Sequence, residues 1–266
     1  VGVGVTAAVA RYLGPTQLGQ LTYARSFVTL FSFLTDLGIG ALLVRELIIN
    51  QGRTNAVLST GMLLKLFGAS MLIIFSNIIS FILVEEKMIR YIILVLSLKY
   101  LYECFNVLDY YYQAKVRSKY IAIINSTVFI LVALLKVFLI YINISLSWFI
   151  VVFLVEGFAI AWLFVWFFMS KEKETISLQF DISLAKGLVK EGMLLTISFI
   201  ATLIIMNFDK IILAQYQDSF AVGIYGVAAT FSATWYFIAT AVSKSIAPIA
   251  SSRNSSYSIP VVVILL

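Results

Sequence analysis

Long apolar runs separated by short polar connections dominate this sequence. A helix needs about 20 mostly apolar residues to cross a bilayer. Seven runs meet this length, with a partial run at residues 1–10 and another from residue 259. The seven runs cover residues 21–44, 57–84, 88–113, 120–142, 148–169, 193–214 and 221–249. Strands of a transmembrane barrel are about ten residues long and alternate in polarity, so the pattern predicts an all-α, polytopic bundle of transmembrane helices.

One connection is longer and more charged than the others, at residues 170–192. Its charged residues are Lys171, Glu172, Lys173, Glu174, Asp181, Lys186, Lys190 and Glu191. This stretch predicts a first six-helix lobe at 1–170, a cytoplasmic linker at 171–192 and the start of a second, truncated lobe at 193–266. Ser183 is in position to cap a short interfacial helix within the linker, although a solvated linker is the simpler interpretation of the charges.

A weak internal repeat agrees with two lobes. At an offset of 204 residues, Tyr12, Gly19, Ala24 and Phe27 recur as Tyr216, Gly223, Ala228 and Phe231. The offset places the first two helices on the seventh and eighth, and an even separation of six spans preserves their orientation. Parallel repeats of this kind occur in transporters. Four identities are also compatible with coincidence.

The basic residues between the runs predict an orientation. Placing the connection after residue 44 in the cytoplasm puts ten Lys and Arg residues inside and three outside. The inside residues are Arg45, Arg53, Lys115, Arg117, Lys119, Lys171, Lys173, Lys186, Lys190 and Arg253, and the outside ones are Arg11, Lys87 and Arg90. Cytoplasmic connections are enriched in Lys and Arg. We therefore expect the chain in a bacterial inner membrane, with its N-terminal side, whose beginning we expect to be missing here, in the cytoplasm.

The composition limits the binding sites and catalytic groups that this chain can contain. The chain is 62% hydrophobic and 12% charged with a mean hydropathy of +1.02, and its net charge of +6 comes from scattered short clusters. Nucleic-acid binding needs a concentrated basic face, so no nucleic-acid partner is expected. Cys104 is the only cysteine and histidine is absent, which excludes intrachain disulfides, Cys/His zinc sites and imidazole bases. Phosphate-loop and hydrolase motifs are also missing. We expect a carrier rather than an enzyme, without cofactor or metal.

Ionisable side chains inside the predicted spans are the main functional candidates, because each costs at least ~2.5 kcal/mol in hydrocarbon and so faces a cavity or a partner. Two helices carry polar stripes at helical spacing. One contains Thr22, Arg25, Thr29, Ser32 and Asp36, and the other contains Lys99, Glu103, Asn106, Tyr110 and Gln113. Interhelical hydrogen bonding is the alternative explanation of the first stripe. In the second stripe, Lys99 and Glu103 can neutralise each other at i,i+4 spacing.

Three further sites add to this set. Lys65 stands between Gly61 and Gly68, which permit close helix approach or leave room beside the ammonium. Lys136 has no carboxylate within one turn of its own helix, so its counter-charge comes from a ligand or from another helix, where Glu156 is the candidate. Asp209 is expected near the outer end of its helix.

Two segments carry a family resemblance. Residues 11–47 read RYLGPTQLGQLTYARSFVTLFSFLTDLGIGALLVREL, and residues 209–248 read DKIILAQYQDSFAVGIYGVAATFSATWYFIATAVSKSIAP. The first resembles the start of Wzx-type polysaccharide and O-antigen exporters of the multidrug/oligosaccharidyl-lipid/polysaccharide superfamily. It has their ARYLGP-like turn at 10–15, their Asp36 and Gly38, and their Arg-Glu pair at 45–46. The second is similar to the seventh and eighth helices of that family.

The resemblance implies a two-lobed flippase that moves undecaprenyl-diphosphate-linked oligosaccharide to the outer leaflet for surface polysaccharide biosynthesis. Membrane lipid and other polysaccharide assembly proteins are the further partners it implies. Family members have a cavity lined by Arg and Lys, and Arg25, Lys65, Lys99 and Lys136 are the matching candidates here. Few arginines lie within the spans, so lysines carry most of this charge. Asp36, Glu103, Glu156 and Asp209 are the candidate counter-charges or ion-coupling groups.

Other functions stay open on the sequence. A drug/cation antiporter of the same superfamily would be favoured if carboxylates outnumbered cations at the cavity, and the candidates do not clearly do so. A non-transport structural subunit requires all intramembrane charges to be paired. A membrane-embedded sugar polymerase requires long outer loops with catalytic residues, and the outer connection at 143–147 is short and uncharged.

Overall fold

The computed structural model describes residues 2–172 and 179–232. Within these residues every regular element is a helix, and six helical stretches are long and apolar enough to cross a membrane. They span Gly4–Ile49, Thr54–Leu83, Lys87–Ala114, Ser118–Tyr141, Leu146–Lys171 and Ile182–Tyr216, and a shorter apolar helix covers Ser219–Ser232. The predicted all-α transmembrane bundle is confirmed. Most of the predicted span at 221–249 lies outside the described residues.

The first long stretch begins with a kinked helix. α1 is Gly2–Leu30, and it changes direction at Gly14, whose φ of 72° lies in the left-handed region. Glycine adopts this conformation without the steric penalty of a Cβ, and Pro15 directly after it cannot donate a helical hydrogen bond. The expected turn before the helix at 21–44 is therefore a sharp kink that joins two arms of one helix.

The predicted helix at 21–44 is not continuous, so this part of the prediction was wrong. α1 ends at Leu30, α2 is Phe33–Asp36 and α3 is Gly40–Ile49. Leu37 and Gly38 separate α2 from α3 with φ values of 50° and 62°. At this break the backbone lies directly against α9, because a Cβ on Gly38 would overlap the carbonyl oxygen of Gly192. Apolar length shows that a segment crosses the membrane, but it does not show this local change of backbone conformation.

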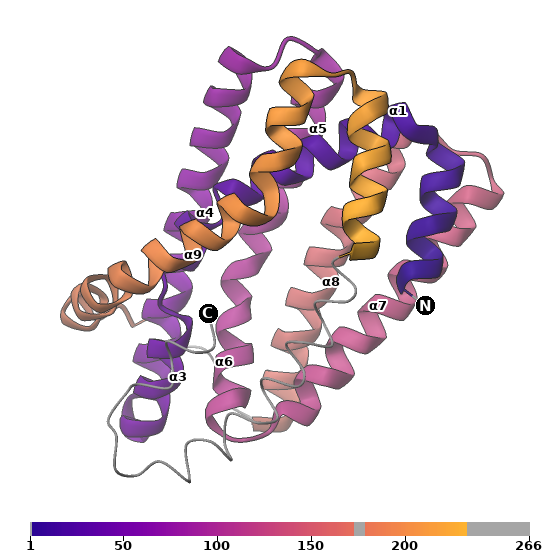
Figure 1. Ribbon diagram of the computed structural model, residues 1–266. Helices are drawn as coiled ribbons and strands as arrows, with labels where there is room; N and C mark the ends of the chain where they lie inside the picture. The colour runs from indigo at the N-terminus through magenta and orange to yellow at the C-terminus, as the bar shows by residue number, and fades with distance from the viewer. Residues whose placement is uncertain (1, 173–178, 233–266) are drawn as a thin grey trace, which may run out of the picture.

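The remaining elements follow the predicted runs closely, except that α9 begins at Ile182, eleven residues before the predicted start at 193 and inside the predicted linker. They are η1 at Gln51–Arg53, α4 at Thr54–Leu83, α5 at Lys87–Leu98, η2 at Lys99–Asn106, α6 at Val107–Ala114, α7 at Ser118–Tyr141, α8 at Leu146–Glu172 and α9 at Ile182–Tyr216. The predicted helix at 88–113 therefore contains a central 3-10 stretch of eight residues. Such stretches rarely exceed three or four residues, and inside a helix they often mark a hinge or strain. Figure 1 shows α7 and α8 side by side, with α9 crossing α1 and α4.

Buried apolar side chains form two clusters, one toward each end of the bundle. The first joins the kink of α1 to the start of α5, the end of α7 and the start of α8, and includes Leu21, Ile93 and Phe149. The second joins α3 to the start of α4, α6 and the end of α8, and includes Leu58 and Tyr112. The predicted lobes at 1–170 and 193–266 stay a prediction, since much of the second lies outside the described residues.

Candidate functional site

Five of the predicted intramembrane charges lie at one level of the bundle, between the two apolar clusters. Along α4, for example, Lys65 falls between Leu58 of one cluster and Leu72 of the other. The five residues are Asp36 in α2, Lys65 in α4, Lys99 and Glu103 in η2, and Glu156 in α8. We call them the polar layer. Both interruptions of regular helix, after α2 and at η2, occur at this level, so the charges accompany the least regular backbone of the bundle.

Lys65 is the most buried member of the polar layer. Its side chain is 4% exposed, and its Nζ lies 3.5 Å from Oδ1 of Asp36, whose side chain is 35% exposed. The same ammonium lies 5.2 Å from the centre of the Tyr110 ring, which is close enough for a cation–π interaction. Gly68 brings α4 close to α2, since a Cβ there would overlap the Leu34 carbonyl. The glycine beside Lys65 therefore serves helix packing, and Lys65 already has a protein counter-charge.

Glu103 links the ion pair of Lys65 and Asp36 to Lys99. It interacts electrostatically with Lys99 on its own element and with Lys65 and Asp36 on neighbouring ones. Lys99 packs beside α8, where a Cβ on Gly157 would meet its side chain. The predicted pairing of Lys99 with Glu103 is consistent with this arrangement, although Glu103 also shares its charge with Lys65.

Arg25 and Lys136 form a second group toward the kinked end of α1. The guanidinium carbon of Arg25 lies 5.8 Å from the centre of the Phe153 ring, and the Lys136 Nζ lies 5.0 Å from the same centre. Lys136 also interacts electrostatically with Glu156, with Arg25 and with Lys99. Glu156 is thus the nearby carboxylate that the sequence suggested for Lys136, but two neighbouring cations repel that ammonium.

A small cavity of about 140 Å³ lies between these two cations. Its lining includes Thr22 and Arg25 from α1, Lys136 from α7 and Phe153 from α8, together with Gly226 of the Ser219–Ser232 helix. An intramembrane ionisable group is expensive unless a partner or water surrounds it. Two cations that share one aromatic ring and one cavity therefore form the part of the bundle best suited to hold an anion.

Two aromatic residues of this region were missed by the sequence reasoning. Phe153 was one phenylalanine among many in an apolar run, so no local signal distinguished it. Tyr100 forms side-chain hydrogen bonds with Thr29 and Ser32, and so joins the first polar stripe to η2. The i,i+3 and i,i+4 spacing of that stripe indicated a partner on another helix, but it could not identify which residue.

Asp209 has different surroundings. Its Oδ1 lies 3.0 Å from the Nζ of Lys210, and its Oδ2 accepts a hydrogen bond of 2.6 Å from the hydroxyl of Tyr225. These contacts join α9 to the Ser219–Ser232 helix. The contacts described for Asp209 are therefore local, and they do not bring it to the polar layer where the other candidate counter-charges lie.

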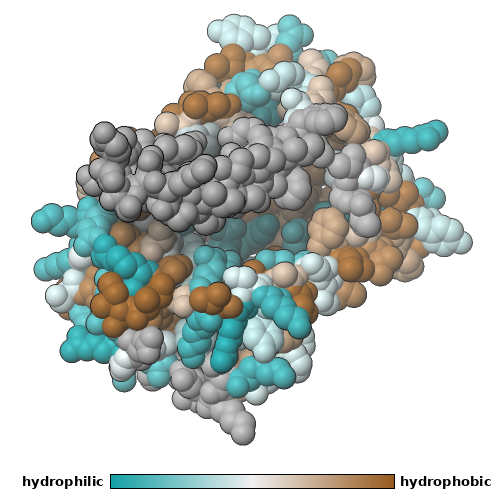
Figure 2. Space-filling model, turned by 60° about the horizontal axis from the view of Figure 1, so that its bottom comes forward, coloured by the Kyte–Doolittle hydropathy of each residue, from teal (hydrophilic) through white to brown (hydrophobic). Residues whose placement is uncertain are grey.

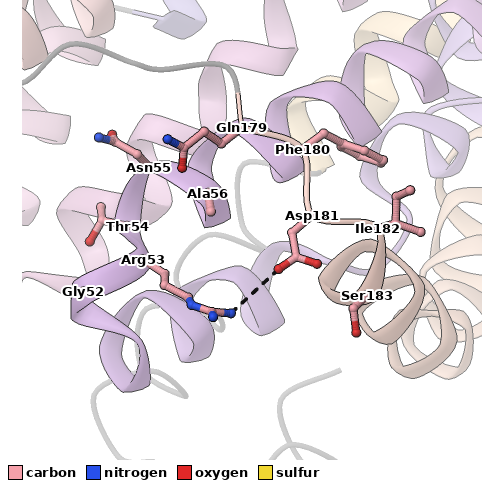
Figure 3. A pocket seen from close by; sticks show the side chains of 10 residues that line it. All are labelled: Gly52, Arg53, Thr54, Asn55, Ala56, Gln179, Phe180, Asp181, Ile182 and Ser183. Carbon is pink, nitrogen blue, oxygen red and sulfur yellow. Dashed lines mark ion pairs between the residues drawn. The ribbon is translucent and has the colours of Figure 1, made fainter.

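At the opposite end, the start of α9 is attached to α3 and η1. Arg45 and Glu191 form an ion pair of 2.8 Å, and Arg53 and Asp181 form one of 3.9 Å. The second pair borders an open pocket of about 830 Å³ (Figure 3). Asp181, and not Ser183 as predicted, caps α9 by accepting from the Leu184 N–H, because α9 begins one residue earlier than Ser183. Exposed ion pairs contribute little individually.

Hydrophilic side chains gather at this end of the molecule, around a hydrophilic hollow (Figure 2). It is the end that the Lys and Arg distribution places in the cytoplasm. The grouping agrees with a bundle whose polar interior is approached from that side.

The polar layer and the adjoining pair of Arg25 and Lys136 together contain four cations and three carboxylates. In the described residues, no cluster of Cys, Asp and Glu side chains has the arrangement of a metal site. A protein-family model described as "Polysaccharide biosynthesis protein" matches residues 1–253. No curated protein and no solved structure matches the chain.

Proposed function

Because this chain belongs to the polysaccharide biosynthesis protein family, we propose that it is a flippase that carries lipid-linked oligosaccharide across a bacterial cell membrane. Family membership and six apolar helices of spanning length make it a multi-pass membrane protein. The proposed substrate is an undecaprenyl-diphosphate-linked repeat unit for surface polysaccharide. The proposed location is the inner membrane, with the N-terminal side in the cytoplasm, as the excess of Lys and Arg on that side favours.

The observation that carries this proposal is the group of cations inside the helix bundle, Arg25, Lys99 and Lys136. A diphosphate headgroup with its sugars is polar and anionic, so it needs a cationic, hydrated route, whereas a polyprenyl tail can stay in lipid. Arg25 and Lys136 share a cavity, and Lys99 lies within electrostatic range of Lys136. Transporters place substrate sites at interrupted helices, and the interruptions after α2 and at η2 lie at the level of the polar layer, which contains Lys99.

The cations divide into two proposed roles. Arg25 and Lys136 bind the anionic headgroup, with Lys99 as the next cation along the route. Lys65 already has Asp36 as its partner at 3.5 Å, so this pair supports the bundle or responds to an ion. Glu103 and Glu156 balance the cations when substrate is absent. No bond is made or broken in this process, so the protein is proposed to act as a carrier and not as an enzyme.

A drug/cation antiporter is the second candidate. The observation that favours it is that three carboxylates, Asp36, Glu103 and Glu156, outnumber the two lysines of the polar layer. The cavity itself is lined by cations. A cationic drug would bind these carboxylates, and its transport would continue when Lys136 is neutral. A purely structural subunit would depend on the same charges for folding alone.

Replacing Lys136 tests these candidates. We expect Lys136→Gln to lower surface polysaccharide while protein abundance in the membrane stays near normal. Burying Lys136 beside the cations Arg25 and Lys99 is unfavourable for folding, so removing its charge should not destabilise the protein. Lys136→Arg should keep much of the export, since it preserves the charge. Lys119→Gln is the matched control, because Lys119 is an exposed lysine at the start of α7.

Abundance and polysaccharide must be measured in the same cells. Export that falls only in proportion to abundance would mean that Lys136 is part of the scaffold, and headgroup binding would have to be abandoned. Export that is insensitive to Lys136→Gln, combined with lost drug resistance in Glu156→Gln, would instead favour the antiporter.

A further inference from the structure

Two segments that the predicted 204-residue repeat aligns lie directly against each other. They are the second arm of α1, residues 15–30, and the Ser219–Ser232 helix. A Cβ on Gly19 would overlap the backbone carbonyl of Ser219, and a Cβ on Gly223 would overlap the backbone carbonyl of Pro15. Backbone therefore meets backbone here, with no side chain between the two helices at these positions.

The contact is reciprocal under the offset of 204 residues. Pro15 corresponds to Ser219 and Gly19 corresponds to Gly223, since 15 and 19 plus 204 give 219 and 223. Gly19 thus meets Ser219 and Gly223 meets Pro15, and these two contacted residues are themselves counterparts under the offset. Self-complementary contacts of this kind define a two-fold axis between identical subunits. The structure has the same relation between two segments of one chain.

The contact continues one turn further along both helices. A Cβ on Gly226 would meet the side chain of Thr22, and 22 plus 204 is 226. Thr22 and Gly226 both line the cavity that contains Arg25 and Lys136. The glycine contact therefore lies one turn from the cavity lining, on the side of the α1 kink, which is the predicted outer side.

We propose that the Gly19–Gly223 contact is the outer gate of the carrier. This inference rests on the proposed function, since a gate has a purpose only where a substrate passes. Small residues let helix backbones approach closely in a membrane, where van der Waals and Cα–H···O contacts hold them. Contacts of this type involve no ion pair and no interlocked side chain. The two helices can therefore separate at this point without stranding a charge, and the cavity then opens to the outside.

A steric wedge tests the gate. In a Cys104→Ala background, Thr22→Cys reports access to the cavity through its reaction with a membrane-impermeant thiol reagent added outside intact cells expressing the full-length protein. We expect Gly19→Leu and Gly223→Leu each to raise this labelling several-fold and to lower export. Gly4→Leu is the matched control, because a Cβ on Gly4 meets no atom within 4 Å.

The symmetry of the contact gives a second requirement. One wedge already separates the helices, so the double variant should label no more than either single variant. Gly19→Ala and Gly223→Ala provide smaller wedges for the case in which leucine lowers the amount of protein in the membrane, and abundance is measured for every variant. Labelling at parental levels in alanine variants of normal abundance would overturn the gate, as would strict additivity of the two wedges.

Labelling needs no substrate, so the gate and the proposed function can fail separately. Increased labelling by the wedges, together with polysaccharide that is insensitive to Lys136→Gln, would support a gate in a carrier of another substrate. Unchanged labelling in cells whose polysaccharide depends on Lys136 would overturn the gate and leave the flippase proposal intact.

Discussion

The ion pair between Lys65 and Asp36 yields the prediction that follows most directly from the structure. At 3.5 Å and an effective dielectric constant of about 20, the Coulomb attraction between the two charges is about 5 kcal/mol. Removing one partner of a buried pair typically costs about 3–5 kcal/mol. We expect Lys65→Met to lower the free energy of unfolding by about 3 kcal/mol, the low end of that range, because the stranded Asp36 carboxylate is one-third exposed.

Replacing the other partner, Asp36, should lower the free energy of unfolding by more. Asp36→Asn removes the ion-pair partner of an ammonium whose side chain is 4% exposed, although Glu103 still interacts with it, so we expect a loss of about 4 kcal/mol, in the middle of that range. The double variant Lys65→Met/Asp36→Asn leaves neither charge behind and should lose only about 1 kcal/mol, mostly the cation–π contact of Lys65 with Tyr110. A double-mutant cycle isolates the interaction between the two residues.

The assay is thermal unfolding of the detergent-purified protein, together with its abundance in the membrane. Lys190→Met provides the control for removing an exposed lysine. Losses of stability that simply add in the double variant would show that Lys65 and Asp36 do not act as a pair. A normal stability for Lys65→Met, accompanied by lost export, would instead move Lys65 from the scaffold to the substrate route.

Three further predictions address topology, the aromatic partner of the cations and helix packing. A cysteine placed in the connection at 143–147 should react with an impermeant thiol reagent in intact cells, and one placed at 170–192 should not; the reverse pattern would invert the proposed orientation. Phe153→Leu should reduce export at normal abundance while Phe153→Trp retains it, because only an aromatic ring interacts with both cations; equal export by the two variants would contradict this. Gly68→Ala should lower thermal stability, since its Cβ would overlap the Leu34 carbonyl, whereas Gly187→Ala meets no neighbour within 4 Å and should not; equal melting temperatures would show that α4 can shift at little cost.

The candidate site was only partly predictable. The charges could be found from sequence because an ionisable residue within an apolar run is conspicuous and costly. The pairing of Lys65 with Asp36 could not, since the two residues belong to different helices and Glu103 was an equally plausible partner. Phe153 could not be identified as a site residue from the sequence. Its role comes from the two cations that lie near its ring, and not from its own chemistry.

The sequence by itself determined which segments are helices, and for α4, α7 and α8 it also determined where each one begins and ends within a few residues. This is a local property, because hydrocarbon requires about 20 apolar residues per span and backbone hydrogen bonds satisfied within each segment. Only the tertiary structure decided where the helices break, at Leu37–Gly38 and η2, and which charges lie together. It also decided that Gly19 meets Gly223. Those features depend on contacts between helices that are distant in sequence, and in a membrane such contacts are selected by close packing and by the pairing of polar groups.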